Sequence, residues 1–461
     1  MTSTSPTADS PTEDRPSPSG AGPESPAEQG AQTPAEQQSA QATGATAART
    51  AEATDDPNAE QETRPTRARG AAPESTTAPG ALFRVPRERW QRIARVAGVP
   101  FAVFGGSTVL HLVILAAMNP AGGASLSGRL LAWDSQWYLD IARHGYSGSY
   151  SFTPGGPPAD NTLAFFPAYP FLVRVVHTVT GLGYDGAALL TSHLALLAAL
   201  VCVHALVVRL YGRRTAVAMT VLVAAAQPMA LVFLMAYSES LFLAFAAGTL
   251  LALHRRSWLT AGALALLAGL TRPAAVAVIA ALGVAVLLDA VRERRLAPHP
   301  TAALALACCG TPAYLLWVGV HTGRMDAWFA IQEAGWGTHW DNGGSFFDFL
   351  GQTLAHGDGW IPVSTALLLL AVLACTAFAW WDGVWPPLLV YGTVVTVLTF
   401  GQSNYYHSKL RLLIPALVFL LPLARALARA RTRAAAVALA AASLFGCWFG
   451  AYMLTVWPYA I

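Results

Sequence analysis

The residues best suited to chemistry lie in WDSQWYLDIARHGY, residues 133 to 146, where an acid is surrounded by aromatic side chains. Wound as a helix, this stretch places Trp133, Trp137 and Tyr138 on the same side as Asp134. A carboxylate in a partly apolar setting can serve as a general base. The alternative is that Asp134 only caps the helix that follows it, since Asp is a favoured N-cap residue. Capping does not explain the aromatic surroundings, so we favour a catalytic base with the three aromatic residues as substrate contacts.

A second acid of the same stretch, Asp140, has a different setting. It lies on the polar side of the predicted helix, with Arg143 and His144 three and four positions further on. This spacing is typical of solvated ion pairs on a helix surface. We therefore expect Asp140 to take no part in the chemistry.

Two arginines are candidates for holding an anion, because each lies at the edge of an apolar segment. Arg272 is in GLTRPAA, residues 269 to 275, and Arg411 is in HSKLRLLIPA, residues 407 to 416. An arginine at such a place is costly in lipid and commonly faces a cavity or an anion. Its planar guanidinium can grip two oxygens of a phosphate. Arg272 and Arg411 are therefore predicted to bind a donor phosphate, whereas Lys409 is expected to extend toward lipid headgroups.

Further substrate contacts are predicted in two other segments. Glu239 lies in YSESLF, residues 237 to 242, although a carboxylate in the first turn of a helix also complements the helix dipole. Gln332 and Trp336 lie in WFAIQEAGWGTHWDNG, residues 328 to 343. The alternative for this second segment is an aromatic belt at a membrane interface, where tryptophan is enriched.

The composition indicates which elements must position these residues. Of the 461 residues, 54% are hydrophobic and 12% are charged, whereas a soluble globular protein has about 25% charged residues. The chain is therefore predicted to be an all-α polytopic membrane protein. Residues 1–80 have almost no large apolar side chains, so we expect a disordered cytoplasmic tail before a multi-spanning domain at 81–461. No secretory signal is recognisable near Met1.

Eleven stretches are candidates for membrane-spanning helices, which need about 20 apolar residues. Several of them are short, which suggests broken or tilted helices packed inside a bundle. The candidates lie near residues 98–118, 185–208, 215–235, 238–254, 257–270, 273–290, 301–320, 361–381, 386–401, 411–424 and 434–455.

Arginine accumulates on one side of this eleven-span arrangement, which the positive-inside rule makes cytoplasmic. The N-terminus is then cytoplasmic and the C-terminus exterior. Most candidate residues fall in or beside the three exterior segments 119–184, 321–360 and 402–409, and Glu239 and Arg272 lie at the outer ends of other predicted spans. Within the first of them, FFPAYPFLVRVV at 165–176 is predicted to lie in the membrane interface, because two prolines in an aromatic run suit that position better than a span. The arginine clusters are Arg84 to Arg95, Arg213 and Arg214, Arg255 and Arg256, Arg292 to Arg295, and Arg425 to Arg433.

Other kinds of site find no support in the sequence. The five cysteines lie in apolar stretches without metal-ligand spacing, as expected of small core residues. No phosphate-binding loop, nucleotide-binding fold or Ser/His/Asp arrangement rises above chance, and we expect neither a metal nor a cofactor. The net charge is only +3, and the arginines lie beside apolar segments, so we expect the partner to be a lipid bilayer and not a nucleic acid.

In their order along the chain, these motifs resemble the PIG-V family of GT-C mannosyltransferases. The resemblance extends from about residue 130 to about residue 425. One departure is that Pro273 and Ala274 follow Arg272, where eukaryotic members commonly have a small polar pair. The matching pieces are WDSQWYLDIARHGY, FFPAYP, YSESLFLAF, GLTRPAA, a Gln- and Trp-rich loop, and RLLIPA.

The resemblance implies a GT-C bundle that transfers a hexose, mannose above all, from a polyprenyl-phosphate donor to a glycolipid, glycan or protein acceptor. It implies transfer on the outer face of the membrane, inversion at the anomeric carbon, and Asp134 as the base. The residues agree independently, because inverting transfer needs one base and cations for the leaving phosphate. Asp134, Arg272 and Arg411 would supply these groups.

Two other classes of protein share parts of this pattern. A multi-pass transporter or flippase of lipid-linked sugars would also have many spans and broken helices, but such proteins usually carry charged residues near the midplane and show internal repeats. A non-catalytic scaffold subunit would need no acid among aromatic residues. Here the candidate residues gather at the outer ends of spans and no repeat is visible, so a glycosyltransferase is favoured.

Overall fold

Helices make up the regular structure of the computed structural model, which describes residues 87–147, 162–357 and 359–459. Over these described residues no β-strand is formed, and one isolated β-bridge joins Trp340 to Gln402. The predicted all-α fold is therefore confirmed. The tail predicted for residues 1–80 lies outside the described residues.

The helices follow one another with short connections. Short turns of 3₁₀- or π-helix interrupt them at η1 (Thr162–Ala164), η2 (Leu222–Ala226), η3 (Ala230–Leu234) and η4 (Pro273–Ala275). The α-helices are α1 (Arg87–Met118), α2 (Leu126–Leu130), α3 (Ser135–His144), α4 (Ala168–Thr180), α5 (Tyr184–Tyr211), α6 (Arg213–Val221), α7 (Glu239–His254), α8 (Trp258–Gly269), α9 (Val276–Glu293), α10 (Pro298–Ala307), α11 (Gly310–Thr322), α12 (Ala327–Trp336), α13 (Gly344–His356), α14 (Trp360–Trp381), α15 (Pro386–Gly401), α16 (Tyr406–Leu413), α17 (Leu420–Arg429) and α18 (Thr432–Thr455).

The helices long and apolar enough to cross a membrane correspond to predicted spans. Three shorter apolar helices, α7, α8 and α15, coincide with three more of the predictions. The remaining two predicted spans, 215–235 and 411–424, are each interrupted by a non-helical turn. The chain is thus a multi-pass membrane protein, whereas the predicted count of eleven spans is not confirmed. In the described part of the chain the six long helical stretches are Gly98–Met118, Tyr184–Tyr211, Pro273–Glu293, Pro298–Thr322, Trp360–Trp381 and Thr432–Thr455.

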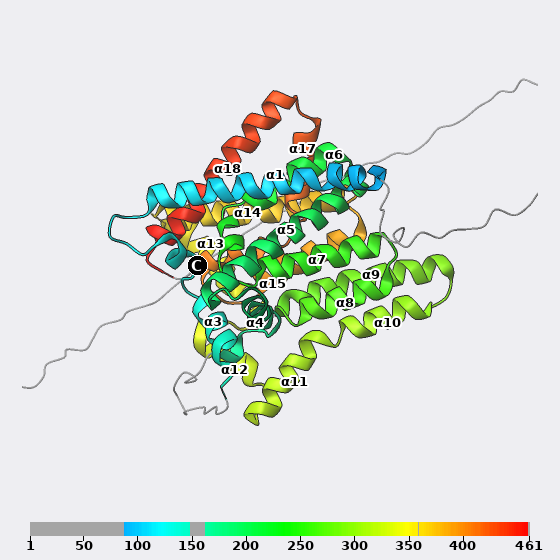
Figure 1. The fold of residues 1–461 in the computed structure, drawn as a ribbon, viewed down its shortest axis with the longest axis horizontal. Helices are drawn as coiled ribbons and strands as arrows, with labels where there is room; N and C mark the ends of the chain where they lie inside the picture. The colour runs from blue at the N-terminus through cyan, green and yellow to red at the C-terminus, as the bar shows by residue number, and fades with distance from the viewer. Residues whose placement is uncertain (1–86, 148–161, 358, 460–461) are drawn as a thin grey trace, which may run out of the picture. The chain divides into compact units, whose positions relative to one another are not determined.

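The short helices lie inside the bundle. Figure 1 shows α7, α8, α9 and α10 running side by side, and α7 contacts α5, α8 and α9. Most side chains of α7 are buried, as expected of a helix that is apolar all round. Because α7 is held on several sides, the residues at its start have fixed positions.

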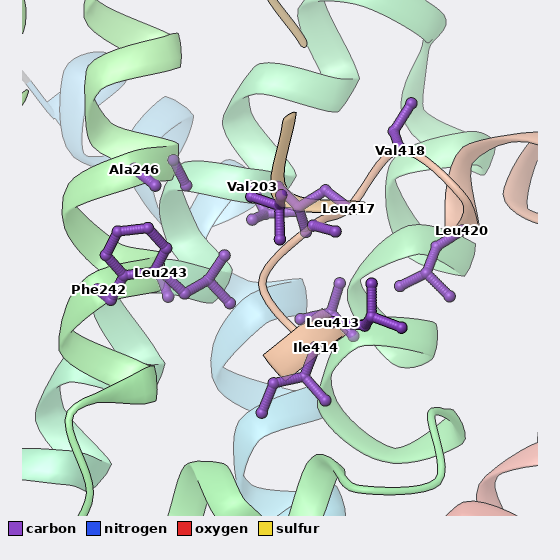
Figure 2. Packing of buried hydrophobic residues seen from close by; sticks show 14 of the residues in the cluster. Val203, Phe242, Leu243, Ala246, Leu413, Ile414, Leu417, Val418 and Leu420 are labelled. Carbon is purple, nitrogen blue, oxygen red and sulfur yellow. The ribbon is translucent and has the colours of Figure 1, made fainter. Parts of the chain in front are cut away.

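The interruption between α16 and α17 lies deep in the core. Ile414, Leu417 and Val418 are at most 2% exposed. Figure 2 shows them in one cluster with Val203 of α5 and Phe242 of α7. The apolar side chains of this segment thus fasten the end of α16 to the centre of the bundle.

Two buried side chains satisfy the irregular backbone of that segment. The Gln227 amide donates to the carbonyl of Ile414 over 3.2 Å, and the Tyr391 hydroxyl donates to the carbonyl of Pro415 over 2.8 Å. Non-helical backbone at membrane depth is tolerated when its polar groups find such partners. The prediction of broken helices packed inside a bundle is confirmed here.

The second interruption, within predicted span 215–235, is covered by α18. There α6 continues into the π-turn η2, and the 3₁₀-turn η3 follows. Gly446 of α18 meets this turn so closely that a Cβ atom would lie 2.4 Å from the carbonyl oxygen of Ala225. Only glycine permits this approach, so the small residue lets α18 cover the broken segment.

The arginine clusters at 213–214 and 425–433, far apart in sequence, meet at one place. Arg213, Arg214, Arg425 and Arg429 line a common surface hollow between α6 and α17. Figure 1 shows α6 and α17 well away from α3, α12 and α13. This arrangement accords with a basic end and a separate end that carries the candidate residues, while the orientation in the membrane remains a prediction.

Candidate active site

Asp134 directly precedes α3, and its side chain does not cap that helix. The residue occupies the N-cap position, but its carboxylate makes no hydrogen bond to the first turn. Trp133 has a φ of 59° and packs against the main core. The prediction that Trp133 shares a helical face with Asp134 is therefore wrong, because the helix begins only at Ser135. A left-handed backbone conformation is strained for a tryptophan, and at Trp133 it forms the turn that directly precedes Asp134.

Asp134 is paired with Arg411 of α16. The Arg411 Nη1 donates to the Asp134 Oδ2 over 2.7 Å, and the two side chains are 12% and 19% exposed. The guanidinium lies over the ring of Tyr237, with its Cζ 5.3 Å from the ring centroid, which is a cation–π contact. The Tyr237 hydroxyl in turn accepts a hydrogen bond from the backbone N–H of Asp134 over 3.2 Å. The base candidate and a phosphate candidate are thus in direct contact.

Glu239, at the start of α7, links the two arginines. Its Oε1 lies 2.6 Å from the Arg272 Nη1 and 3.7 Å from the Arg411 Nε, and the side chain is only 2% exposed. The first turn of α7 also stabilises this negative charge through the helix dipole, as the alternative interpretation anticipated. Asp134, Arg411, Glu239 and Arg272 form a row of alternating charge, which we call the ionic row.

Tyr138 of α3 connects to this row through Ser238. Its hydroxyl lies 2.7 Å from the Ser238 Oγ, which also accepts a hydrogen bond from the Arg272 Nη1 over 3.4 Å. Burial raises the pKa of Tyr138, and the nearby negative charges of Glu239 and Asp134 act in the same direction. The phenol therefore stays protonated and can donate a hydrogen bond.

A pocket opens beside the ionic row, and it has both charged and aromatic walls. Aromatic side chains with a few convergent polar groups are typical of ligand-binding pockets. Six of the predicted site residues line it: Asp134, Arg272, Arg411, Tyr138, Gln332 and Trp336.

The aromatic wall is built from η1, α3 and α12. Phe165 packs edge-on against Trp336 and Tyr138, at ring-centroid distances of 5.5 Å and 4.9 Å. The Gln332 Nε2 and the Trp328 Nε1 both donate to the carbonyl of Ala164, over 3.1 Å and 3.3 Å. This arrangement joins the two segments predicted to be exterior, 119–184 and 321–360, through η1 and α12. It places Trp328 in the pocket wall instead of a lipid-facing aromatic belt.

The opposite wall consists of two short segments that pair with each other. The backbone N–H of Ser403 donates to the carbonyl of His339 over 2.8 Å. Trp340 lies so close to Gly401 that a Cβ atom at Gly401 would be 2.3 Å from its ring. Gln402 and Thr338, from the two paired segments, line the pocket. The glycine is thus required where the segment that contains Trp340 crosses the end of α15.

Lys409 does not extend toward lipid headgroups, so that expectation is wrong. It is 1% exposed, and its Nζ donates to the carbonyls of Thr399 and Gln402 over 3.0 Å and 2.8 Å. These carbonyls lie in the last turn of α15 and directly after it, where helix geometry leaves carbonyl groups without partners. Lys409 therefore fastens α16 to the end of α15 and supports the pocket wall.

Three predicted substrate contacts lie outside the pocket. Trp133 packs in the core, and Glu239 lies behind the two arginines without lining the pocket. Trp137 stacks on Phe165 at 6.2 Å and lines a separate surface hollow with Asp140. In that hollow the carboxylate of Asp140 pairs with His144 at 2.8 Å on the exposed side of α3, as the spacing predicts.

The sequence patterns did not single out several residues that the structure brings to the site. Tyr237 supports both Asp134 and Arg411, and Asn404 and Ser408 line the pocket. The Oδ1 of Asn404 is buried without a hydrogen-bond partner among the described residues. Tyr237 lies within the motif YSESLF, Ser408 lies within HSKLRLLIPA, and Asn404 lies in the segment 402–409 just before it, so proximity to a motif was the available signal.

The site combines a carboxylate with two guanidinium groups around one pocket. A phosphate in the pocket would meet Arg272 and Arg411, and a hydroxyl nucleophile would meet Asp134. Over the described part of the chain, no three His, Cys, Asp or Glu side chains are placed to hold a metal ion.

Comparison with known proteins finds one family that matches part of the chain. Residues 113–290 match the family described as Mannosyltransferase (PIG-V), which confirms the predicted resemblance. No curated protein has significant sequence similarity to the chain.

Solved structures with a similar arrangement are more distant. ArnT from Cupriavidus metallidurans bound to undecaprenyl phosphate is 18% identical with a TM-score of 0.47, and the match covers 74% of this chain and 62% of ArnT. The oligosaccharyltransferase AglB from Archaeoglobus fulgidus, in complex with an inhibitory peptide and a dolichol-phosphate, is 12% identical with a TM-score of 0.42. That match covers 77% of this chain and 56% of AglB. The chain thus spans less than two thirds of the length of either protein.

Proposed function

Because residues 113–290 match the family described as Mannosyltransferase (PIG-V), we propose that the chain transfers mannose from a polyprenyl-phosphate donor to a hydroxyl of a glycolipid, glycan or protein. The observation that carries the proposal is the convergence of Asp134, Arg272 and Arg411 on one pocket. The charge pattern supports it, since the reaction needs one proton acceptor and a cationic site for a leaving phosphate.

The reaction is a single displacement. The acceptor oxygen attacks the anomeric carbon, and its proton passes to the Asp134 carboxylate as the new C–O bond forms. The bond between the anomeric carbon and the phosphate oxygen breaks at the same time, and polyprenyl phosphate leaves with one additional negative charge. A single displacement from the face opposite the leaving group inverts the configuration at the anomeric carbon.

The arginines stabilise the charge that develops on the phosphate. Arg272 and Arg411 are 17% and 12% exposed, and electrostatic interactions are stronger where water is partly excluded. During the reaction Asp134 loses its negative charge by accepting a proton, and the leaving phosphate gains one negative charge. The total charge of the pocket therefore stays the same. The ionic row contains both the carboxylate that accepts the proton and the arginines that stabilise the phosphate.

The aromatic wall would bind the sugar. Phe165 and Trp336 present apolar ring surfaces beside polar groups of Tyr138 and Gln332, a combination suited to a hexose. We further propose that the pocket faces the extracytoplasmic side, because the arginine clusters at 213–214 and 425–433 gather elsewhere, as the positive-inside rule expects of the cytoplasmic end.

The test compares two isosteric Asp→Asn substitutions, one at Asp134 directly before α3 and one at Asp140 within α3. In purified protein with polyprenyl-phosphate mannose as donor, Asp134→Asn should lower turnover by about 10²–10⁴-fold, the usual contribution of a general base. Donor binding should survive, because the amide keeps the size of the carboxylate. Asp140→Asn is the matched control and should keep normal turnover, since that side chain is exposed and pairs with His144.

Near-normal turnover of Asp134→Asn would remove Asp134 from the mechanism. A wild-type protein that transfers no mannose from this donor to any acceptor in a cell-envelope extract would refute the proposed activity itself. The acceptor can be identified by mass spectrometry of envelope glycolipids and glycoproteins from a deletion strain, in which the natural product should lack one hexose.

A further inference from the structure

Two buried polar atoms of the ionic row have no hydrogen-bond partner among the described residues. They are the Glu239 Oε2, an acceptor, and the Arg411 Nε, a donor. The Nε lies 3.7 Å from the other oxygen of the same carboxylate, which is too long for a hydrogen bond. Buried polar groups are nearly always paired, so an unpaired donor beside an unpaired acceptor calls for an explanation.

The contact between Arg411 and Asp134 calls for a second explanation. A guanidinium at 2.7 Å stabilises the charged carboxylate and so weakens it as a proton acceptor. The same arginine is one of the two that face the place proposed for the donor phosphate. Arg411 cannot give its full hydrogen-bonding capacity to both groups at once.

We infer that Arg411 is a switch between Asp134 and the donor, and that Glu239 is the positioning residue that makes the switch possible. This inference rests on the proposed function. When the phosphate enters, Arg411 turns from Asp134 toward the phosphate, and Glu239 accepts the Arg411 Nε–H. Asp134 becomes a free base only while a donor is bound.

The required movement is small. Shortening the distance from 3.7 Å to a usual N–H···O length of about 2.9 Å needs a shift below about 1 Å. Rotation of the Arg411 side chain suffices for this, so the backbone of α16, held by Lys409 and the buried segment after Leu413, can stay in place. Glu239 keeps its bond to Arg272 in either position, because a carboxylate oxygen has two lone pairs and the Glu239 Oε1 can accept from both arginines.

Without Glu239 the switch would be unfavourable. Taking Arg411 from Asp134 leaves one buried charge with a weaker partner, which is costly in a low-dielectric site. The buried carboxylate of Glu239 compensates by holding the Nε side of the guanidinium while the Nη side contacts phosphate. The arrangement thus couples donor binding to activation of the base and predicts that donor binds before the acceptor reacts.

The coupling has a signature in the pH dependence of the rate. The groups that face Asp134 come from three other elements and from α3 itself: Arg411 on α16, Tyr237 and Glu239 at the start of α7, Arg272 at η4, and Tyr138 on α3. Of these, only Arg411 makes a direct ion pair with Asp134 among the described residues. Moving it to a phosphate should therefore change the pH dependence of the rate between the free enzyme and the donor complex.

The experiment measures the acid side of two pH profiles with polyprenyl-phosphate mannose and the natural acceptor. The profile of kcat/KM for the donor reports the free enzyme, and that of kcat reports the complex. For the wild type, the midpoint of the acid limb should lie at a higher pH in kcat than in kcat/KM, because an adjacent positive charge has moved away from the base. Coinciding midpoints in the wild type would overturn the inference without any variant being made.

Variants of Glu239 provide the second arm. Glu239→Gln keeps the side-chain shape but loses the charge, so the two midpoints should move together and kcat should fall at least tenfold. Glu239→Asp keeps the charge and should restore part of the separation, which a merely structural role would not do. Asp140→Asn is the control and should give the wild-type profiles. A Glu239→Gln protein that keeps the full separation would overturn the role of Glu239.

These outcomes differ from failure of the proposed function. If the wild type transfers no mannose from the donor, the mannosyltransferase proposal and the switch both fall. If transfer occurs but the midpoints coincide, the switch alone is refuted and the enzyme assignment stands.

Discussion

Replacing Arg411 by lysine tests the phosphate site with a control that the structure itself supplies. Arg411 pairs with Asp134 at 2.7 Å and lies over Tyr237 at 5.3 Å. Between α17 and the end of α14, Arg425 repeats the arrangement, with its Nη1 2.6 Å from Asp382 and its Cζ 5.4 Å from the ring centroid of Tyr211. The two arginines thus lose similar structural contacts when changed to lysine.

The two variants should differ in catalysis. Lysine keeps the positive charge but lacks the planar fork that holds two oxygens. Losing one hydrogen bond to a charged phosphate costs about 1.5–3 kcal/mol, which is about a 10- to 150-fold decrease in kcat/KM for the donor. Arg411→Lys should show this decrease, whereas Arg425→Lys should keep kcat/KM within about twofold of the wild type.

The assay is transfer from radiolabelled polyprenyl-phosphate mannose by purified protein, with thermal unfolding followed in parallel. Both variants should unfold at slightly lower temperatures, by similar amounts, because both lose a partly buried ion pair with a cation–π contact. Equal loss of activity in Arg411→Lys and Arg425→Lys would show that the effect is structural. Wild-type kinetics of Arg411→Lys would show that Arg411 does not bind the donor phosphate.

Three other predictions concern the pocket wall, the tail and the topology. Gly401→Val should raise KM for the donor while the protein still inserts into the membrane. The reason is that a Cβ atom would lie 2.3 Å from the Trp340 ring and would separate the two paired segments of the pocket wall. An unchanged KM would contradict this role of the wall. Removal of residues 1–80 should leave insertion and transfer nearly intact, since this stretch lacks apolar side chains for a core; a truncated protein at normal level without activity would count against it. A reporter fused after Ile461 should read extracytoplasmic, and a cytoplasmic signal would refute the eleven-span arrangement.

The sequence determined the class of the protein and most of its helices, because both depend on local composition. A run of apolar residues must be helical to satisfy its backbone in lipid, whatever its neighbours are. The span predicted at 98–118 coincides with Gly98–Met118, and the one predicted at 361–381 lies within Trp360–Trp381. The motifs also indicated the family, which residues 113–290 confirm.

Local pattern was less reliable where the chain is irregular. The helical winding of residues 133–146 suggested that Trp133 and Asp134 share a helical face, yet the left-handed φ of Trp133 sets the helix start at Ser135. The predicted span at 411–424 is apolar throughout its middle, and hydrogen bonds from Gln227 and Tyr391 help its backbone to leave the helix. Such bonds come from distant segments, so they leave no local periodicity.

Tertiary structure alone decided the partners of the charged residues. The sequence selected Asp134, Arg272 and Arg411 one by one, because each is a costly residue in an apolar or aromatic setting. It gave no sign that Arg411 touches Asp134 from 277 positions away. The buried lysine illustrates the same limit: Lys409 at the end of a span suggested contact with headgroups, but its two carbonyl partners lie at the end of another helix. Charge and hydropathy are properties of single residues, whereas the pairing of buried charges depends on which helix ends the packed bundle brings together.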